Sequence, residues 1–411
     1  MLDIVKRFFK IAFREWTLFY TDSLAVLLLV VASLIYAIYY PLPYMKEISE
    51  KVPAGIVDLD RTAFSRELIR MADATQDISV YKVYNTSEEA RDDLAGEKIY
   101  GYMEIPKGYE SEVRKGSNVT LGVYGHGAFL MLYRNVATAF STVALTQGAT
   151  VKVKRLVARG NSLAEAQAIR DPIPVRFYNM FNGINGYGAY VVPAVLMLVL
   201  QQSLLIGISI LGGPRKNRHF KSLRGRDQHE DAPFFLRYFG RSAAYLVHYF
   251  SFITIYHFGI YNIFGFPQRG DLFTLFAFGL AFFGAVVNMG MWTAQFFERR
   301  ETGMQIFLCL SIPFLFMSGF SWPRSYMPEW IQILGAFIPT TYAIPAWLAL
   351  ENMGASLKDV WHYIIDLYLL GGFYLILGLT IGKRHDFIRH VWEQRGSQRL
   401  AEHLKKFHPF S

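Results

Sequence analysis

The sequence predicts an α-helical membrane protein with six transmembrane helices, re-entrant helices before the last, and an α/β domain after the first span. Three observations support this fold class. The 411 residues are 52% hydrophobic and 18% charged, whereas soluble proteins contain about 25% charged residues. Several stretches carry almost no charge over about 20 residues, the length that a bilayer-spanning helix needs. One long segment alternates between strand-like and helix-like patterns.

The first predicted span is not a signal peptide, and the apolar segments differ in how often Pro and Gly interrupt them. The first is followed by Pro41 and Pro43 rather than by a cleavage site, so we expect it to be retained. The segment 322–359 is apolar but broken by Pro and Gly, which favours re-entrant helices dipping into the outer leaflet. The spans are predicted at 22–40, 186–211, 242–263, 272–296, 302–321 and 360–382.

Lysine and arginine are unevenly placed around these spans. They concentrate in 1–21, in 212–241, in 297–301 and in the tail 383–411. Because short positive segments stay in the cytoplasm, both termini are predicted to be cytoplasmic. The net charge of +9 then reflects topology. We expect no nucleic-acid partner, since no basic-aromatic binding motif accompanies the charge.

The first 21 residues predict an amphipathic helix. Apolar residues recur at helical spacing, and Lys6, Arg7, Lys10 and Arg14 lie between them. Such a helix lies in the membrane interface, with its cations near lipid headgroups. It is either a simple anchor or an elbow helix that also contacts a cytoplasmic partner.

Residues 41–180 are predicted to form the extracytoplasmic α/β domain. Strands are expected at 54–59, 78–84, 99–105 and 119–124, with helices between them and a long helix over 128–160. Asp58 and Asp60 follow the first strand, and Glu88 and Glu89 begin a helix. No nucleophile accompanies these carboxylates, so we predict turn and cap roles rather than acid–base catalysis.

Two sets of motifs resemble the ABC-2 type transporter permeases. The first set is Ser318-Gly-Phe-Ser-Trp-Pro323, Pro328-Glu-Trp330 and Pro339-Thr-Thr-Tyr342. In that family such elements mark the re-entrant helices, which makes Ser318, Gly319, Pro323, Pro328, Trp330, Pro339 and Tyr342 the signature residues. The second set, found in a subgroup with a large periplasmic insert, is Val57-Asp-Leu-Asp60, Ser65-Arg-Glu-Leu68, Ser87-Glu-Glu-Ala90 and Gly101-Tyr-Met-Glu-Ile-Pro106.

The resemblance implies an export permease in a bacterial inner membrane. A second copy or a paralogue would complete the pathway, and a separate ABC ATPase would drive it. A membrane-fusion adaptor and an outer-membrane channel often extend the route in this subgroup. The chain has no G-x-x-x-x-G-K-[ST] loop, so it is not expected to bind ATP itself. It also has no Gly-x-Ser-x-Gly, His-Glu-x-x-His or Cys-x-x-Cys motif, so we expect no enzyme activity, cofactor or metal of its own. ATP and Mg would be bound by the partner.

The ATPase-coupling residues are expected in cytoplasmic loops. The family often carries an Arg-Glu-Arg-Glu-x-Gly-Thr motif between the second and third spans, but this loop reads Gly213-Pro-Arg-Lys-Asn-Arg-His-Phe-Lys221. Its candidates are Arg215, Lys216 and Arg218. A related string in the next loop offers Glu298, Arg299, Arg300 and Glu301. The alternative is that these charges serve topology alone.

Four polar residues inside the spans are candidates for the transport pathway: His248, His257, Asn288 and Asp366. The two histidines are nine residues apart and therefore on opposite helix faces, so they cannot share a metal from one helix. Interhelical hydrogen bonds explain His248, His257 and Asn288 equally well. Asp366 could instead reach headgroups, or pair with Lys358 or His362. The single cysteine, Cys309, is expected to be buried.

Two other classes of function remain open. The divergent loop motif permits a non-transporting scaffold or receptor whose outer domain binds a partner. An intramembrane enzyme would need a convergent polar set, and the sequence shows none. The aromatic-rich spans suit an amphipathic or lipophilic substrate, but lipid-facing packing explains the same residues.

Overall fold

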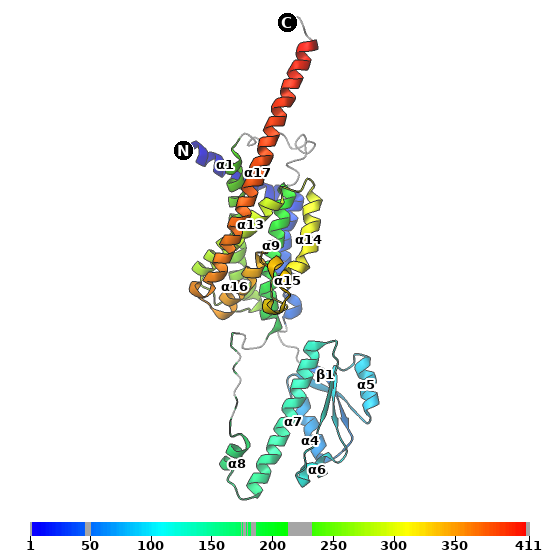
Figure 1. Cartoon of the computed structure of the whole chain (residues 1–411). Helices are drawn as coiled ribbons and strands as arrows, with labels where there is room; N and C mark the ends of the chain where they lie inside the picture. Colours follow the sequence, from blue (N-terminus) through cyan, green and yellow to red (C-terminus); the bar gives the residue numbers. More distant parts are fainter. Residues whose placement is uncertain are drawn as a thin grey trace. The chain divides into compact units, whose positions relative to one another are not determined.

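The computed structural model describes residues 2–45, 51–173, 175, 178, 180–181, 186–212 and 232–407, of which 383–407 are described by their backbone alone. It divides into two compact units. Residues 1–47 and 180–411 form a helical unit, and residues 48–179 form an α/β unit (Figure 1).

The helical unit begins with α1 and a rod made of α2, a π-helical turn η1, and α3. Its elements in chain order are α1 (Leu2–Thr21), α2 (Ser23–Ala25), η1 (Val26–Val31), α3 (Ala32–Tyr39), η2 (Leu42–Tyr44), α9 (Tyr187–Gly212), α11 (Phe234–Thr254), η4 (Ile255–Ile260), α12 (Tyr261–Phe264), α13 (Leu272–Thr293), α14 (Arg300–Met317), η5 (Arg324–Tyr326), α15 (Glu329–Gly335), α16 (Thr340–Met353) and α17 (Leu357–Phe407).

Four helical stretches are long and apolar enough to cross a membrane, namely Ser23–Tyr44, α9, α13 and Leu357–Gly382. The count reaches five if the pair α15 and α16, bent by 79°, is one broken span. The spans expected at 242–263 and 302–321 are helical but are not among these candidates. The first is divided by η4 and follows Arg237 and Arg241, and α14 carries Arg300 and Glu301 in its first turn.

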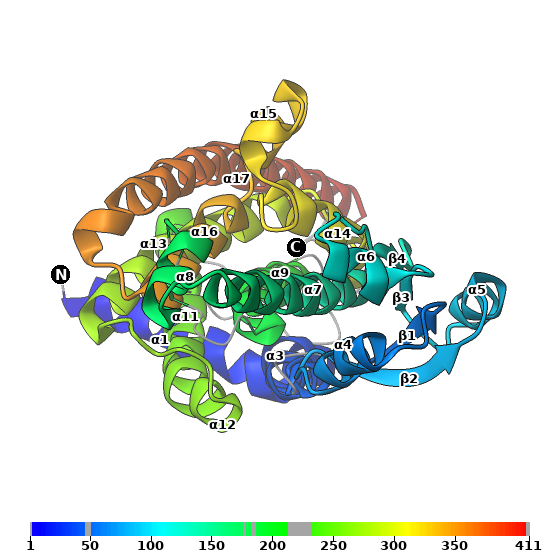
Figure 2. The same ribbon diagram turned by 90° about the horizontal axis from the view of Figure 1, so that it is seen from below.

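Helix α9 is the centre of the helical unit. It is buried along almost its whole length, and α3, α13, α14 and α16 pack around it (Figure 2). A Cβ on Gly212 would lie 2.9 Å from Ala294, and one on Gly382 would lie 2.1 Å from the Phe234 ring. The ends of α9 and α13, the start of α11 and residue 382 of α17 therefore meet at one end of the bundle, where α1 also lies. The bent pair lies at the other end (Figure 1).

The α/β unit is a four-stranded sheet with order β2-β1-β3-β4. Strand β1 pairs in parallel with β2 and β3, and β4 is antiparallel to β3. The strands and helices expected in 54–124 are present. They are β1 (Val52–Asp58), α4 (Ala63–Asp73), β2 (Ile78–Tyr84), α5 (Ser87–Ala95), β3 (Gly101–Ile105), α6 (Tyr109–Lys115) and β4 (Gly122–Gly125), followed by α7 (Leu130–Ala158) and α8 (Leu163–Arg170).

The sheet is covered on both faces. Helices α4 and α7 pack on one face around Ile56, Met103 and Phe140, and α5 covers Val57 and Tyr102 on the other (Figure 1). The helix expected over 128–160 is thus α7, whose middle part supplies buried side chains to this core. An α/β arrangement follows because β1 to β2 and β2 to β3 cross over on opposite faces.

The expectation of a buried cysteine is wrong, because Cys309 is exposed on α14. Its neighbours Leu308 and Ile312 are exposed as well. An apolar run in a membrane helix can face the bilayer as readily as the protein core, so apolarity alone does not predict burial.

Candidate functional site

The predicted coupling residues divide into two groups. Arg215, Lys216 and Arg218 lie outside the described residues. Residues 298–301 are described and form the turn into α14. Glu298, Arg299 and Glu301 are exposed there, whereas Arg300 turns inward.

Arg300 joins the start of α14 to the end of α1. Its Nη2 lies 2.7 Å from Oδ2 of Asp22, and Nη1 lies 3.3 Å from Oδ1. The Asp22 side chain is 4% exposed and that of Arg300 is 20% exposed. Asp22 also accepts a hydrogen bond from the Ala25 N–H and so caps α2. Arg300 therefore stabilises Asp22, the residue between α1 and α2, through an ion pair.

A second buried acid fastens the middle of α1. Glu15 is 3% exposed. It accepts a 3.0 Å hydrogen bond from the Tyr245 hydroxyl, and its other oxygen lies 3.7 Å from Nε of Arg241. Both partners are on α11. Burying a carboxylate is costly unless it is paired. Glu15 and Asp22 are therefore structural contacts that bind α1 to α11 and α14, and not solvent-exposed charges.

Helix α1 carries three kinds of surface. Ile11 packs against Gly240 of α11, where a Cβ would approach it to 3.0 Å. A separate exposed stripe follows helical spacing and consists of Val5, Phe9, Phe13, Trp16 and Tyr20. The basic residues occupy the remaining sector of the helix. This division matches a helix that packs on the bundle, touches lipid and keeps its cations in water.

A groove of about 500 Å³ opens between the beginnings of α1 and α11. Its walls are mostly apolar, with one acid and one base at the α1 side. They consist of Asp3, Ile4, Arg7, Phe8, Pro233, Phe235, Leu236 and Phe239. Phe235 and Phe239 are half exposed. The groove lies at the same end of the bundle as the two acid-mediated attachments of α1.

His248 is held by hydrogen bonds between helices. Its Nε2 lies 3.3 Å from the carbonyl oxygen of Leu29 in η1, and its Nδ1 lies 3.4 Å from the Tyr20 hydroxyl. A neutral imidazole with its proton on Nε2 satisfies both contacts. Nearby, the Tyr256 hydroxyl in η4 donates to the carbonyl of Ser33 in α3. The helix formed by α11 and η4 is thus bonded a second time to the rod made of α2, η1 and α3.

His257 meets an acid that sequence reasoning missed. Its Nδ1 lies 2.8 Å from Oε1 of Glu351 on α16. Glu351 is completely buried. It falls within 322–359, which the sequence predicts to be a re-entrant or extracytoplasmic segment, where an acid is unremarkable. The apolar residues on both sides of it, in helix α16, were the signal that could have identified it.

Asn288 and Asp366 have different environments. Asn288 on α13 accepts from the Tyr238 hydroxyl and donates to the carbonyl of Gly371 on α17. Gln295, two turns further on, donates in the same way to the carbonyl of Gly378. Asp366 is partly exposed, and within the described ranges neither Lys358 nor His362 forms an ion pair with it. The structure does not bring these four candidates together.

The signature residues are placed at turns and helix starts. Ser318 ends α14, and Gly319 follows with φ of 83°, a conformation that favours glycine. Pro323, Pro328 and Pro339 directly precede η5, α15 and α16. Proline suits the start of a helix because its missing N–H would have no partner there.

The aromatic signature residues behave differently. The Tyr342 hydroxyl donates to the carbonyl of Ala336, and the Arg324 guanidinium lies over its ring. Trp330 is 62% exposed. These residues therefore shape a bent helical segment at one end of the bundle.

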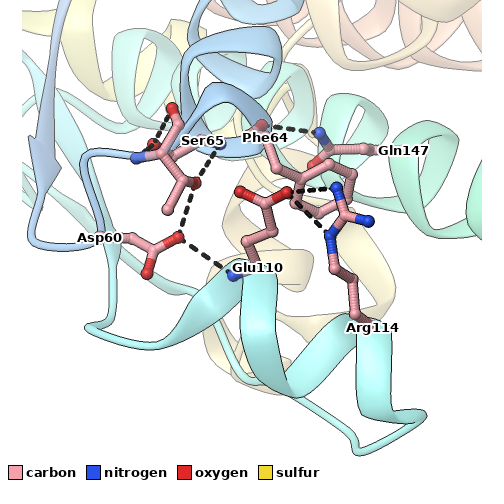
Figure 3. Close-up of polar contacts among 7 residues, drawn as sticks. Asp60, Phe64, Ser65, Glu110, Arg114 and Gln147 are labelled. Atoms are coloured by element: carbon pink, nitrogen blue, oxygen red, sulfur yellow. Dashed lines mark hydrogen bonds and ion pairs between the residues drawn. The ribbon is translucent and has the colours of Figure 1, made fainter.

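In the α/β unit, Asp60 is a structural cap (Figure 3). It accepts hydrogen bonds from the N–H groups of Gly108 and Glu110 and from the Thr62 hydroxyl. Burial opposes its ionisation, but these donors together hold the pKa of Asp60 below its usual range. Asp58 likewise accepts from Asp60 N–H and Ser65. Both oxygens of each carboxylate thus accept hydrogen bonds from the turn and from the helices next to it, which agrees with the predicted turn and cap roles.

No group of three or more His, Cys, Asp or Glu side chains gathers within metal-binding reach in the ranges that the structure describes. A bundle with several helices that are long and apolar enough to cross a membrane, and with α1 fastened to one end, is typical of integral membrane proteins. The chain belongs to the ABC-2 family of transporter proteins, whose family model matches residues 16–380.

Two curated relatives support this class. The inner membrane transport permease YhhJ of Escherichia coli (strain K12) is 28% identical over 120 residues, which cover 29% of this chain and 32% of the relative. The protein of the same name from Shigella flexneri matches to the same extent. The matched segment thus spans about a third of the length of these relatives.

Proposed function

We propose that this chain is the membrane-spanning permease subunit of an ATP-driven ABC-2 exporter in a bacterial inner membrane. The observation that carries the proposal is that the family model covers most of the chain. The names of the relatives, both inner membrane transport permeases, support the location. ATP and Mg are bound by a separate ATPase, and a second copy or a paralogue completes the pathway.

The proposed topology has six spans and cytoplasmic termini. The helical stretches at 242–263 and 302–321 complete the set, and α15 with α16 is a re-entrant pair rather than a fifth broken span. The 79° bend and the exposed Trp330 support the re-entrant form. The α/β unit then lies outside the membrane, where its surface and the α7–α8 hairpin are available to a membrane-fusion adaptor leading to an outer-membrane channel.

We place ATPase docking at the end of the bundle that carries α1. The groove between α1 and α11 receives apolar side chains of the ATPase, and Arg215, Lys216 and Arg218 in the adjoining loop contact its surface. Movement of the ATPase reaches the spans through Glu15 and Asp22, because these acids fasten α1 to α11 and α14. Glu298, Arg299 and Glu301, exposed at the same end, widen the docking surface.

The test is purification of the full chain in mild detergent from cells that express its native neighbours. We expect a stoichiometric ATPase and vanadate-sensitive ATP hydrolysis. Replacing Arg215, Lys216 and Arg218 together by Ala, or Phe235 by Ser, should reduce the amount of bound ATPase.

The matched control for Phe235→Ser is Phe273→Ser, since Phe273 is also exposed but begins α13 at the opposite end of the bundle. Loss of ATPase in both variants would contradict docking at the groove. A chain that purifies without any ATPase would refute the exporter and favour a scaffold whose outer unit binds a partner.

A further inference from the structure

Among the acid–base pairs described above for the helical unit, His257 and Glu351 form the most deeply buried one. The Glu351 side chain is 0% exposed and that of His257 is 9% exposed. One carboxylate oxygen lies 2.8 Å from the imidazole Nδ1. The other, Oε2, is buried and makes no close hydrogen bond among the described residues, although the Gly270 N–H also faces the carboxylate.

The other charges nearby do not neutralise this carboxylate. His257 faces it from η4, and the Tyr261 hydroxyl on α12 is close but takes a hydrogen bond from Trp347. Arg269 lies in the connection between α12 and α13. Its backbone N–H donates a hydrogen bond to the Glu351 carbonyl, and its side chain is exposed. The acids and bases that begin α13 and α17 are exposed too: Asp271, Lys358 and Asp359.

The pair joins two elements at one end of the bundle. His257 lies in the π-helical turn η4, and Glu351 lies in the last turn of α16, which ends at Met353. Asn352, the next residue, donates to the carbonyl of Ala189 at the start of α9. Any separation of α16 from η4 must therefore break the contact between His257 and Glu351.

An isolated carboxylate in such a site is strongly disfavoured, and so is an isolated imidazolium. The pair is neutral when it holds one proton, either as imidazolium with carboxylate or as imidazole with carboxylic acid. We propose that His257 and Glu351 form a proton-binding site that holds one proton at neutral pH and joins η4 to α16. The inference does not depend on the proposed transport function.

The test compares thermal unfolding of the purified full chain in detergent between pH 6 and pH 9. In the unfolded chain a histidine loses its proton near pH 6.5, whereas the folded site keeps its proton. The folded state then binds more protons, so its stability falls as pH rises above that value, by tenfold in the folding equilibrium per pH unit for one proton.

The variant Glu351→Gln removes the acid but retains a hydrogen-bonding side chain, and the imidazole that remains can stay neutral. We expect its unfolding midpoint to fall less steeply with pH than that of the wild type. In His257→Gln the buried carboxyl group keeps the proton, so its midpoint should still fall with rising pH. His248→Gln is the control, since His248 is also buried in α11 but contacts a carbonyl and a hydroxyl. It should keep the wild-type slope.

Equal slopes in the wild type and in Glu351→Gln would overturn the proposal. So would a reduced slope of the same size in His248→Gln. If Glu351→Gln does not fold, Glu351→Met, which also removes the acid, takes its place. As a second measurement, isotope-edited infrared spectra should lose one carboxyl or carboxylate band in Glu351→Gln that does not titrate between pH 6 and 8 in the wild type. A band that titrates in this interval would refute a permanently held proton.

Discussion

The close contact between α14 and α9 at Gly303 predicts a large effect of a single methyl group. A Cβ on Gly303 would lie 2.4 Å from Cβ of Ser209 and 2.9 Å from the ring of Phe297. Carbon atoms pack at about 3.5–4.0 Å. The Ser209 Cβ is attached directly to the backbone of α9 and cannot rotate away, so Gly303→Ala must move the two helices apart by roughly 1 Å.

The expected cost follows from two opposing effects. Overpacking of a close contact costs about 1–3 kcal/mol, while alanine is favoured over glycine in a helix by about 1 kcal/mol. We therefore expect Gly303→Ala to lower the free energy of unfolding by about 1 kcal/mol. The matched control is Gly284→Ala on α13, where nothing lies within 4 Å of an added Cβ. That variant should be more stable than the wild type.

Thermal unfolding midpoints of both variants in one detergent provide the measurement. Gly303→Ala should unfold below the wild type and Gly284→Ala above it. If Gly303→Ala is as stable as Gly284→Ala, the helices are not packed as closely as the structure shows, and the reasoning from this contact fails.

Three further predictions concern polar contacts. Asp22→Asn keeps the helix cap, since asparagine caps as well as aspartate. It should still lower the free energy of unfolding by about 1–3 kcal/mol, because Arg300 loses its charged hydrogen-bond partner, and a double-mutant cycle with Arg300→Met should measure the coupling between the two side chains. The pKa of Asp60 is lowered because its hydrogen-bond donors outweigh the effect of burial. Its contribution to stability is therefore complete above the pKa of an unfolded aspartate, about 3.9. The contribution is lost as the pH falls through the lower pKa of the folded state. The protection factor of the Gly108 amide, that is, its exchange rate relative to the unfolded chain at the same pH, should fall on acidification in the wild type and should be low at all pH values in Asp60→Asn. Asn288→Leu should destabilise the helical unit by about 1–3 kcal/mol, because it leaves two buried partners without their bonds, and the same thermal assay measures this loss.

The α/β unit was readily predictable because its signals are local. The apolar alternation of the strands, and the acids Glu88 and Glu89 at the start of α5, each lie within the element that they indicate. The order of the strands was not predictable in this way. It depends on which strand edges pair, and β1 lies between β2 and β3 only in the folded sheet.

The polar contacts of the helical unit were harder to predict. The sequence identified His257 as a candidate but not its partner, since Glu351 lies 94 residues away. It treated Arg300 as a docking charge, whereas the structure pairs it with Asp22, 278 residues earlier in the chain. A sequence pattern reports which residues share a helix face, but not which face of another helix meets it.

The sequence by itself determined that this protein is helical, lies in a membrane and carries an α/β insert, because helix length, apolarity and periodicity are properties of contiguous residues. Its motifs also indicated the family that the comparison shows. Only the tertiary structure decided which acids are buried, how α1 is fastened to the bundle, and that His257 and Glu351 share one enclosed site. The physical reason is that burial and pairing depend on the packing of distant segments, which a single sequence does not record.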